Sequence, residues 1–153
     1  MTYLKDLFTN PLFLSAGSAW FISQALKMIL ETLKGGFHPE RLSGGGGMPS
    51  AHSATVTGLA GAALLRFGAG GFEFVMALFF AIIVIYDAMG VRYETGQEAR
   101  ILNLLRKRDQ AKGEPPLFEK PLDEKMGHTL PEIIAGCAIG IICSVAVSHL
   151  PFV

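Results

Sequence analysis

Charged residues are scarce in this chain. Asp, Glu, Lys and Arg make up 17% of the 153 residues, against about 25% in a typical soluble domain. The 13 basic and 13 acidic residues cancel, which argues against a nucleic-acid partner held by net charge. Cysteine is also rare: Cys137 and Cys143 lie in one apolar stretch, at a spacing that points them in different directions on a helix, so no mutual disulfide is expected.

Apolar residues dominate instead, at 50% of the chain with a mean hydropathy of +0.41. A helix that crosses a bilayer needs about 20 mostly apolar residues. We predict four such spans, an amphipathic helix over residues 94–108 and a mobile loop over residues 109–125. The expected fold is an all-α, polytopic membrane bundle of about four transmembrane helices plus a cytoplasmic amphipathic helix and loop. It forms one membrane domain over residues 1–153, with spans at about 7–33, 50–67, 72–91 and 131–150 and a polar segment at 92–128.

Lys and Arg gather in the two polar loops, residues 34–48 and 92–128. Loops of membrane proteins that are rich in Lys and Arg stay in the cytoplasm. We therefore predict a multi-pass protein of the cell membrane with both polar loops, and any active site at that end of the spans, at the cytoplasmic face.

A glycine run, residues 44–47, leads into the second span. Free backbone N–H groups and the positive end of the helix dipole favour an anion at such a place. Ser50 is also an ordinary N-cap residue, and for the loop alone that interpretation is the stronger one. His52, just inside the helix, favours the anion site.

Several polar side chains lie at the same-side ends of the four spans. Charges at membrane depth are expensive and usually face a shared interior. A phosphoryl group, whose negative charge is spread over several oxygens, suits such a set of donors. The residues are Lys27, Arg41, Ser50, His52, Asp87, Arg92, His128 and Glu132.

Residues 49–53, Pro-Ser-Ala-His-Ser, resemble the P-S-G-H signature of the type 2 phosphatidic acid phosphatase superfamily, which also contains vanadium haloperoxidases. Lys34 and Arg41 have the K-x6-R spacing of its first motif, with Leu42 where that motif has proline.

The third motif of the superfamily, S-R-x5-H-x3-D, is matched in part. His128 and Glu132 have the H-x3-D spacing, with glutamate for aspartate. Leu122 stands where the motif has its arginine, and Arg92 is the candidate replacement.

The ordered set of residues 47–53, 86–92 and 127–129 resembles the short divergent branch of this superfamily in particular. In that branch a Q-x-x-K pattern recurs in the first span, and Gln24 and Lys27 match it. The resemblance covers nearly the whole chain.

The resemblance implies an integral-membrane phosphatase that needs no metal or cofactor and that binds vanadate as a phosphate mimic or inhibitor. His128 would attack phosphorus, Glu132 would hold its other ring nitrogen, and His52 would protonate the leaving oxygen. The phosphoryl oxygens would be held by Arg41, Arg92, Ser50 and one of Lys27 or Lys34, with Asp87 and Gly47 in support.

Five of these roles have alternatives. For His128 the alternative is a loop histidine at the membrane interface, and for Lys27 it is a side chain that snorkels to the membrane surface. Thr129-x-x-Glu132 is also a capping-box pattern, so Glu132 has an equal claim to closing the start of a helix. Asp87 is more simply explained as a neutralising partner of Arg92 or Lys27. Lys34 has the position of a surface cation that sets topology.

The expected partner is a lipid phosphate of the phosphatidate, phosphatidylglycerophosphate or polyprenyl phosphate class, and no nucleic acid. We also hypothesise a homo-oligomer that closes the pocket. The alternative function is a non-catalytic lipid-phosphate binding or transport subunit that retains the anion pocket; a haloperoxidase is a weaker third possibility.

Overall fold

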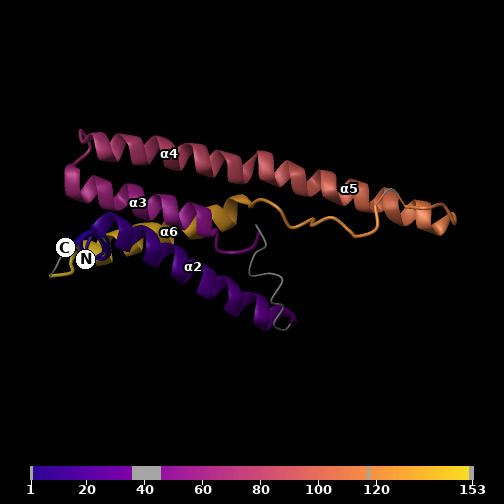
Figure 1. Ribbon diagram of the computed structural model, residues 1–153, viewed down its shortest axis with the longest axis horizontal. Helices are drawn as coiled ribbons and strands as arrows, with labels where there is room; N and C mark the ends of the chain where they lie inside the picture. The colour runs from indigo at the N-terminus through magenta and orange to yellow at the C-terminus, as the bar shows by residue number, and fades with distance from the viewer. Residues whose placement is uncertain (1, 36–45, 117, 152–153) are drawn as a thin grey trace.

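The computed structural model describes residues 2–35, 46–116 and 118–151. These residues form helices and contain no strand, which confirms the all-α prediction (Figure 1). The helices are α1 (Thr2–Phe8), α2 (Pro11–Gly35), α3 (Ala51–Phe67), α4 (Phe72–Met89), α5 (Val91–Ala111) and α6 (Leu130–Ser148).

In the described ranges, three helical stretches are long and apolar enough to cross a membrane: Pro11–Leu33, Phe72–Ala111 and Leu130–Ser148. The remaining expected span, residues 50–67, corresponds to α3, which has 17 residues. At 1.5 Å per residue it is roughly 26 Å long, slightly less than the bilayer core of about 30 Å. Large apolar side chains such as Phe79, Ile83 and Ile142 are exposed on the outside of the bundle, where a membrane protein meets lipid.

Helix α3 lies at the centre of the bundle, with α4 on one side and α2 and α6 on the other (Figure 1). Its buried residues are small, Ala54, Ala62 and Ala63 among them. The facing side of α6 presents Gly136 and Gly140, and a Cβ atom added to Gly140 would lie 2.6 Å from the carbonyl oxygen of Ala54. The two backbones therefore touch through a G-x-x-x-G face, as small residues allow in membrane helices.

Helix α2 packs against α3 through a stripe of residues spaced four apart. Ser15, Ala19, Ser23 and Lys27 are all buried, because residues at this spacing share one face of a helix. Asn10 caps the start of α2 by accepting from the N–H of Leu12 at 2.9 Å. The stripe explains why the Lys27 side chain points into the bundle.

Helix α4 breaks at Gly90, and α5 continues beyond the bundle in nearly the same direction (Figure 1). The return segment, residues 118–128, then runs back along α5. The side chain of Asn103 accepts from the N–H of Leu122 at 2.9 Å and donates to its carbonyl at 2.9 Å. The guanidinium of Arg106 donates to the carbonyl of Phe118 at 3.0 Å. The mobile loop expected here is instead tied to α5, because two polar side chains of α5 satisfy its backbone groups.

Candidate active site

His128 is placed by backbone contacts at the point where the return segment meets the α4–α5 junction. Its N–H donates to the carbonyl of Ala88 at 2.9 Å. The preceding residue, Gly127, has a φ of 76°, and a Cβ atom there would lie 2.5 Å from the Cα of Tyr93. Only glycine allows this close approach without strain.

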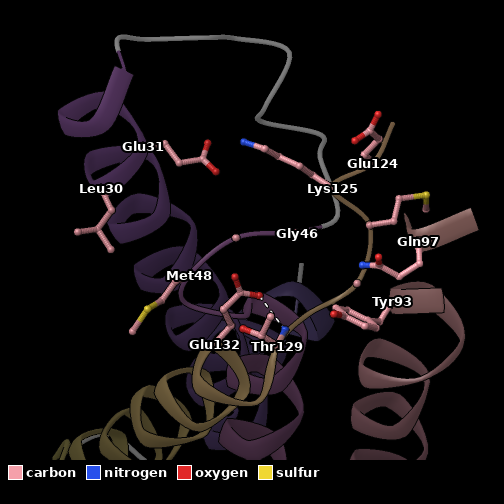
Figure 2. Close-up of a pocket in the computed structure, with 13 residues that line it drawn as sticks. Leu30, Glu31, Gly46, Met48, Tyr93, Gln97, Glu124, Lys125, Thr129 and Glu132 are labelled. Atoms are coloured by element: carbon pink, nitrogen blue, oxygen red, sulfur yellow. Dashed lines mark hydrogen bonds between the residues drawn. The ribbon is translucent and has the colours of Figure 1, made fainter. Parts of the chain in front are cut away.

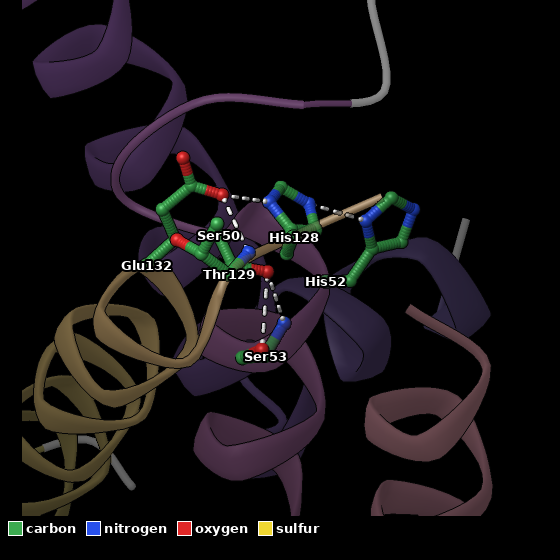
Figure 3. A network of polar contacts seen from close by, with 6 residues as sticks. All are labelled: Ser50, His52, Ser53, His128, Thr129 and Glu132. Atoms are coloured by element: carbon green, nitrogen blue, oxygen red, sulfur yellow. Dashed lines mark hydrogen bonds and ion pairs between the residues drawn. The ribbon is translucent and has the colours of Figure 1, made fainter. Parts of the chain in front are cut away.

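The side chain of His128 lies between Glu132 and His52 (Figure 3). Its Nδ1 is 3.1 Å from Glu132 Oε2, and its Nε2 is 3.4 Å from His52 Nδ1. The whole residue is only 3% exposed. Three residues that the sequence places on two distant segments thus form one line of polar contacts.

Glu132 serves two purposes at the start of α6. Its Oε2 accepts from the backbone N–H of Thr129 at 3.1 Å, the capping-box contact, and faces the His128 ring at the same time. The two interpretations of this residue, as a helix cap and as the partner of His128, are therefore compatible.

Burial lowers the pKa of His128 below its usual value, because a charged imidazolium is disfavoured away from water. The hydrogen bond and negative charge of Glu132 raise the pKa, and the positive charge of Lys27 lowers it. Burial has the largest effect, so the neutral imidazole is the favoured form near pH 7. A carboxylate only accepts hydrogen bonds, so Nδ1 carries the proton and Nε2 keeps a lone pair.

Ser50 is the N-cap of α3 and is fully buried. Its Oγ accepts from the N–H of Ser53 at 3.3 Å and from the Ser53 hydroxyl at 3.0 Å. Its backbone N–H donates to the carbonyl of Glu132 at 3.0 Å. Ser50 therefore joins the starts of α3 and α6, and its geometry is that of the helix cap weighed above.

Lys27 is 6% exposed and belongs to the same cluster. The charges of Glu31 and Glu132 both act on its ammonium group. A Cβ atom at Gly47 would lie 2.8 Å from Lys27 Cε, and the φ of Gly47 is 105°. Gly47 therefore lets the loop before α3 cross directly over the lysine stem.

Arg92 and Asp87 form an ion pair at 2.7 Å, with both side chains nearly half exposed. Both residues lie at the α4–α5 junction, and both of their charges act electrostatically on the imidazole of His52. The pairing agrees with the neutralising role favoured for Asp87. Lys34 lies in the last turn of α2, and Arg41 lies outside the described residues.

A cleft of about 520 Å³ opens beside this cluster, with Glu132 and Thr129 at its floor (Figure 2). Sequence reasoning missed three charged residues of its walls, Glu31, Glu124 and Lys125. Glu31 follows Lys27 by one helical turn in an apolar span, and this charge pair was the available signal. No pattern marks Lys125, because its place depends on how the return segment folds.

A helical bundle with lipid-facing apolar side chains and a buried histidine cluster at one end defines a membrane protein with a candidate acid–base site. The chain belongs to the divergent PAP2 family, which matches residues 8–143. This confirms the predicted likeness to a divergent branch of the type 2 phosphatidic acid phosphatases. The chain is also 31% identical to a Bacillus subtilis (strain 168) protein named "Uncharacterized membrane protein YuiD", over 94% of this chain and 98% of that protein. No solved structure matches the chain.

Proposed function

We propose that this protein is a metal-independent phosphatase that hydrolyses a lipid phosphate through a phosphohistidine intermediate. The observation that carries the proposal is the placement of His128, buried between a carboxylate at 3.1 Å and a second histidine at 3.4 Å. A nucleophile that lies between a base that orients it and an acid is the arrangement of activated-nucleophile catalysis. Here these groups are His128, Glu132 and His52.

In the first step Nε2 of His128 attacks phosphorus. The new N–P bond forms as the bond from phosphorus to the leaving oxygen breaks, and His52 gives its proton to that oxygen. Glu132 keeps the proton on Nδ1 and stabilises the positive charge that develops on the ring. The distance of 3.4 Å between His128 Nε2 and His52 Nδ1 is too short to admit a phosphorus atom. The half-buried His52 side chain must therefore turn aside when the substrate binds.

In the second step water hydrolyses the phosphohistidine. His52, now neutral, accepts a proton from the attacking water, and the N–P bond breaks to release phosphate and restore His128. Lys27 and Arg92, whose charges both act on His52, supply positive charge near the cluster. The first turn of α3 adds a helix N-terminus. The bias of Lys and Arg toward the two polar loops supports a cytoplasmic location for this site.

The decisive experiment measures phosphate release in detergent from phosphatidate, phosphatidylglycerophosphate and a polyprenyl phosphate. We expect vanadate-sensitive turnover that His128→Ala abolishes. The matched control is His149→Ala, since His149 is exposed at the opposite end of α6 and its loss should leave turnover unchanged. Turnover that survives in His128→Ala would contradict the mechanism.

The role of His52 is tested with the leaving group. His52→Ala should slow release from a lipid phosphate by about 10²–10⁴-fold, the usual contribution of a general acid. The loss should be much smaller for p-nitrophenyl phosphate, whose leaving group needs no proton. An equal loss with both substrates would assign His52 a purely structural role.

The alternative is a lipid-phosphate binding or transport subunit without turnover. One observation favours this alternative: two expected phosphate ligands already have other partners. Ser50 caps α3, and Arg92 forms an ion pair with Asp87. This alternative predicts saturable binding of vanadate with no phosphate release from any lipid.

A further inference from the structure

A second polar pocket lies at the end of the bundle opposite the histidine cluster. It is enclosed by the start of α2 and the last turns of α3 and α6, at the end of the bundle that points away from α5 (Figure 1). Its polar lining consists of Ser15, Arg66, Ser144 and Ser148. About four turns of α3 separate His52 from Arg66, which is roughly 20 Å. The pocket is therefore distinct from the site where phosphoryl transfer is proposed.

The size of this pocket limits what it can hold. Its volume is about 110 Å³, whereas pockets for whole small molecules measure roughly 300–1,000 Å³. One water occupies about 30 Å³ in the liquid, so the pocket is larger than a single water needs. A compact polar group, such as the phosphate of a lipid headgroup, lies between these limits.

One hydroxyl group of the lining has no partner. Ser15 is fully buried, and its Oγ makes no hydrogen bond within the part of the chain that the structure describes. A buried polar group in this state is costly. The hydroxyls of Ser144 and Ser148 differ, because they donate to the carbonyls of Ile141 at 2.9 Å and Val145 at 2.7 Å. An acceptor placed in the pocket would satisfy the Ser15 hydroxyl.

The charge of the lining favours an anion. Arg66 carries its only formal charge, and a guanidinium can donate two parallel N–H bonds to a phosphate. Pro11 also lines the pocket, so the positive end of the α2 dipole lies beside it. The last turns of α3 and α6 bring carbonyl groups, but those of Leu64 and Val147 already accept from the turns that follow.

We propose that this pocket binds a phosphate group, with Arg66 and Ser15 as its donors. The guanidinium binds two phosphate oxygens and the Ser15 hydroxyl donates to a third. Two sources share this chemistry, the headgroup of a phospholipid at this end of the bundle and free inorganic phosphate. The inference goes beyond the proposed phosphatase function and does not depend on it, because the two sites lie at opposite ends of α3.

Protection of a cysteine from a maleimide measures occupancy of the pocket without turnover. Leu65→Cys is the reporter, in a chain that also carries Cys137→Ala and Cys143→Ala, because Leu65 lines the pocket, is exposed and contributes no polar group. Dihexanoyl phosphatidylglycerol should slow the labelling and yield an apparent Kd. Dihexanoylglycerol, which lacks the phosphate, should not slow it. A lower Kd for the phospholipid than for inorganic phosphate assigns the lipid as the source, and equal values assign free phosphate.

Variants of the two donors test their roles. Arg66→Gln and Ser15→Ala should each raise the apparent Kd by about tenfold, the usual effect of one hydrogen bond to a charged group. The matched controls are Lys5→Gln, which removes a positive charge from an exposed position outside the pocket, and Ser18→Ala, which removes another hydroxyl of α2. Both controls should leave the apparent Kd unchanged.

His128→Ala separates this inference from the phosphatase proposal. Protection of Leu65→Cys should persist in that variant, whether or not the protein hydrolyses any lipid. Loss of protection in His128→Ala would instead place the bound phosphate at the histidine cluster and refute a second site. Equal protection by dihexanoylglycerol would overturn the proposal, as would protection that survives in both Arg66→Gln and Ser15→Ala, or the absence of protection by either phosphate compound.

Discussion

The backbone N–H of His128 donates to the carbonyl of Ala88 at 2.9 Å, which joins the start of α6 to the end of α4. Carbonyl groups in the last turn of a helix lack partners within that helix, and here the break at Gly90 makes one available to a distant segment. The candidate nucleophile is thus positioned by the main chain, while Glu132 and His52 set the direction of its ring.

The first prediction concerns Glu132. Glu132→Gln should lower kcat/KM for phosphate release by about 10- to 100-fold, because a charged hydrogen bond to the His128 ring is replaced by a neutral one. Steady-state kinetics in detergent measures the effect. Vanadate affinity should change much less, since the substituted residue holds the nucleophile and not the phosphate.

Thr129→Ala is the control for helix capping. This substitution removes the N-cap side chain of α6 but keeps the contact between Glu132 and His128. It should cost about 1 kcal/mol of stability and leave kcat/KM nearly unchanged. If both variants lost activity equally, the role of Glu132 would be limited to the cap.

The second prediction concerns pH. Because burial lowers the pKa of His128, its neutral, nucleophilic form should persist as the pH falls through about 6.5, the usual histidine value. The acid limb of the kcat/KM profile should therefore lie below that value. Glu132→Gln removes a negative charge that raises the pKa of His128 and replaces the charged hydrogen bond by a neutral one, so the acid limb of this variant should move lower still.

The same shift predicts how stability depends on pH. The unfolded chain takes up a proton at His128 near pH 6.5, whereas the folded chain resists it. The contribution of His128 to stability is therefore present above that pH and is lost as the pH falls from the unfolded toward the folded pKa. Thermal unfolding of wild type and His128→Gln at several pH values measures it, and parallel curves for the two proteins would contradict the shift.

Local patterns in the sequence predicted the helices well. The apolar runs, and the Gly-Met-Pro-Ser sequence of residues 47–50 that leads into α3, are readable because a membrane helix must satisfy its own backbone. The meeting of His52, His128 and Glu132 was expected from the resemblance and the same-side placement of the spans. The divided role of Glu132 was also weighed, since its capping spacing is visible in the sequence.

The cleft walls and the course of the return segment were not predictable from the sequence. The contacts of Asn103 and Arg106 with residues 118–124 depend on where a chain without periodicity turns back. Polar residues such as Asn103 have no local pattern that marks their partner. The position of Lys125 opposite Glu31 follows from those contacts and is therefore equally hidden.

The third prediction concerns helix packing. Gly140→Ala should destabilise the protein by about 1–3 kcal/mol, because the new Cβ would lie 2.6 Å from the Ala54 carbonyl and must push α3 and α6 apart. Gly17→Ala is the matched control, since nothing lies within 4 Å of a Cβ at that helical position. Thermal unfolding in detergent should show a lower midpoint for the first variant and an equal or higher one for the second.

The fourth prediction concerns the hydrogen bonds by which Asn103 of α5 holds the return segment. Asn103→Ala removes three hydrogen bonds, two to the backbone of Leu122 and one to the carboxylate of Glu124. We expect faster proteolysis within residues 118–125 and a loss of kcat/KM of about tenfold or more, since His128 follows directly in the chain. Gln110→Ala, an exposed position on the same helix, is the control. Faster proteolysis with unchanged activity would show that the contacts of Gly127 and Ala88 alone are enough to hold His128. Faster proteolysis together with the expected loss of kcat/KM would establish that the hydrogen bonds of Asn103 help to position the nucleophile.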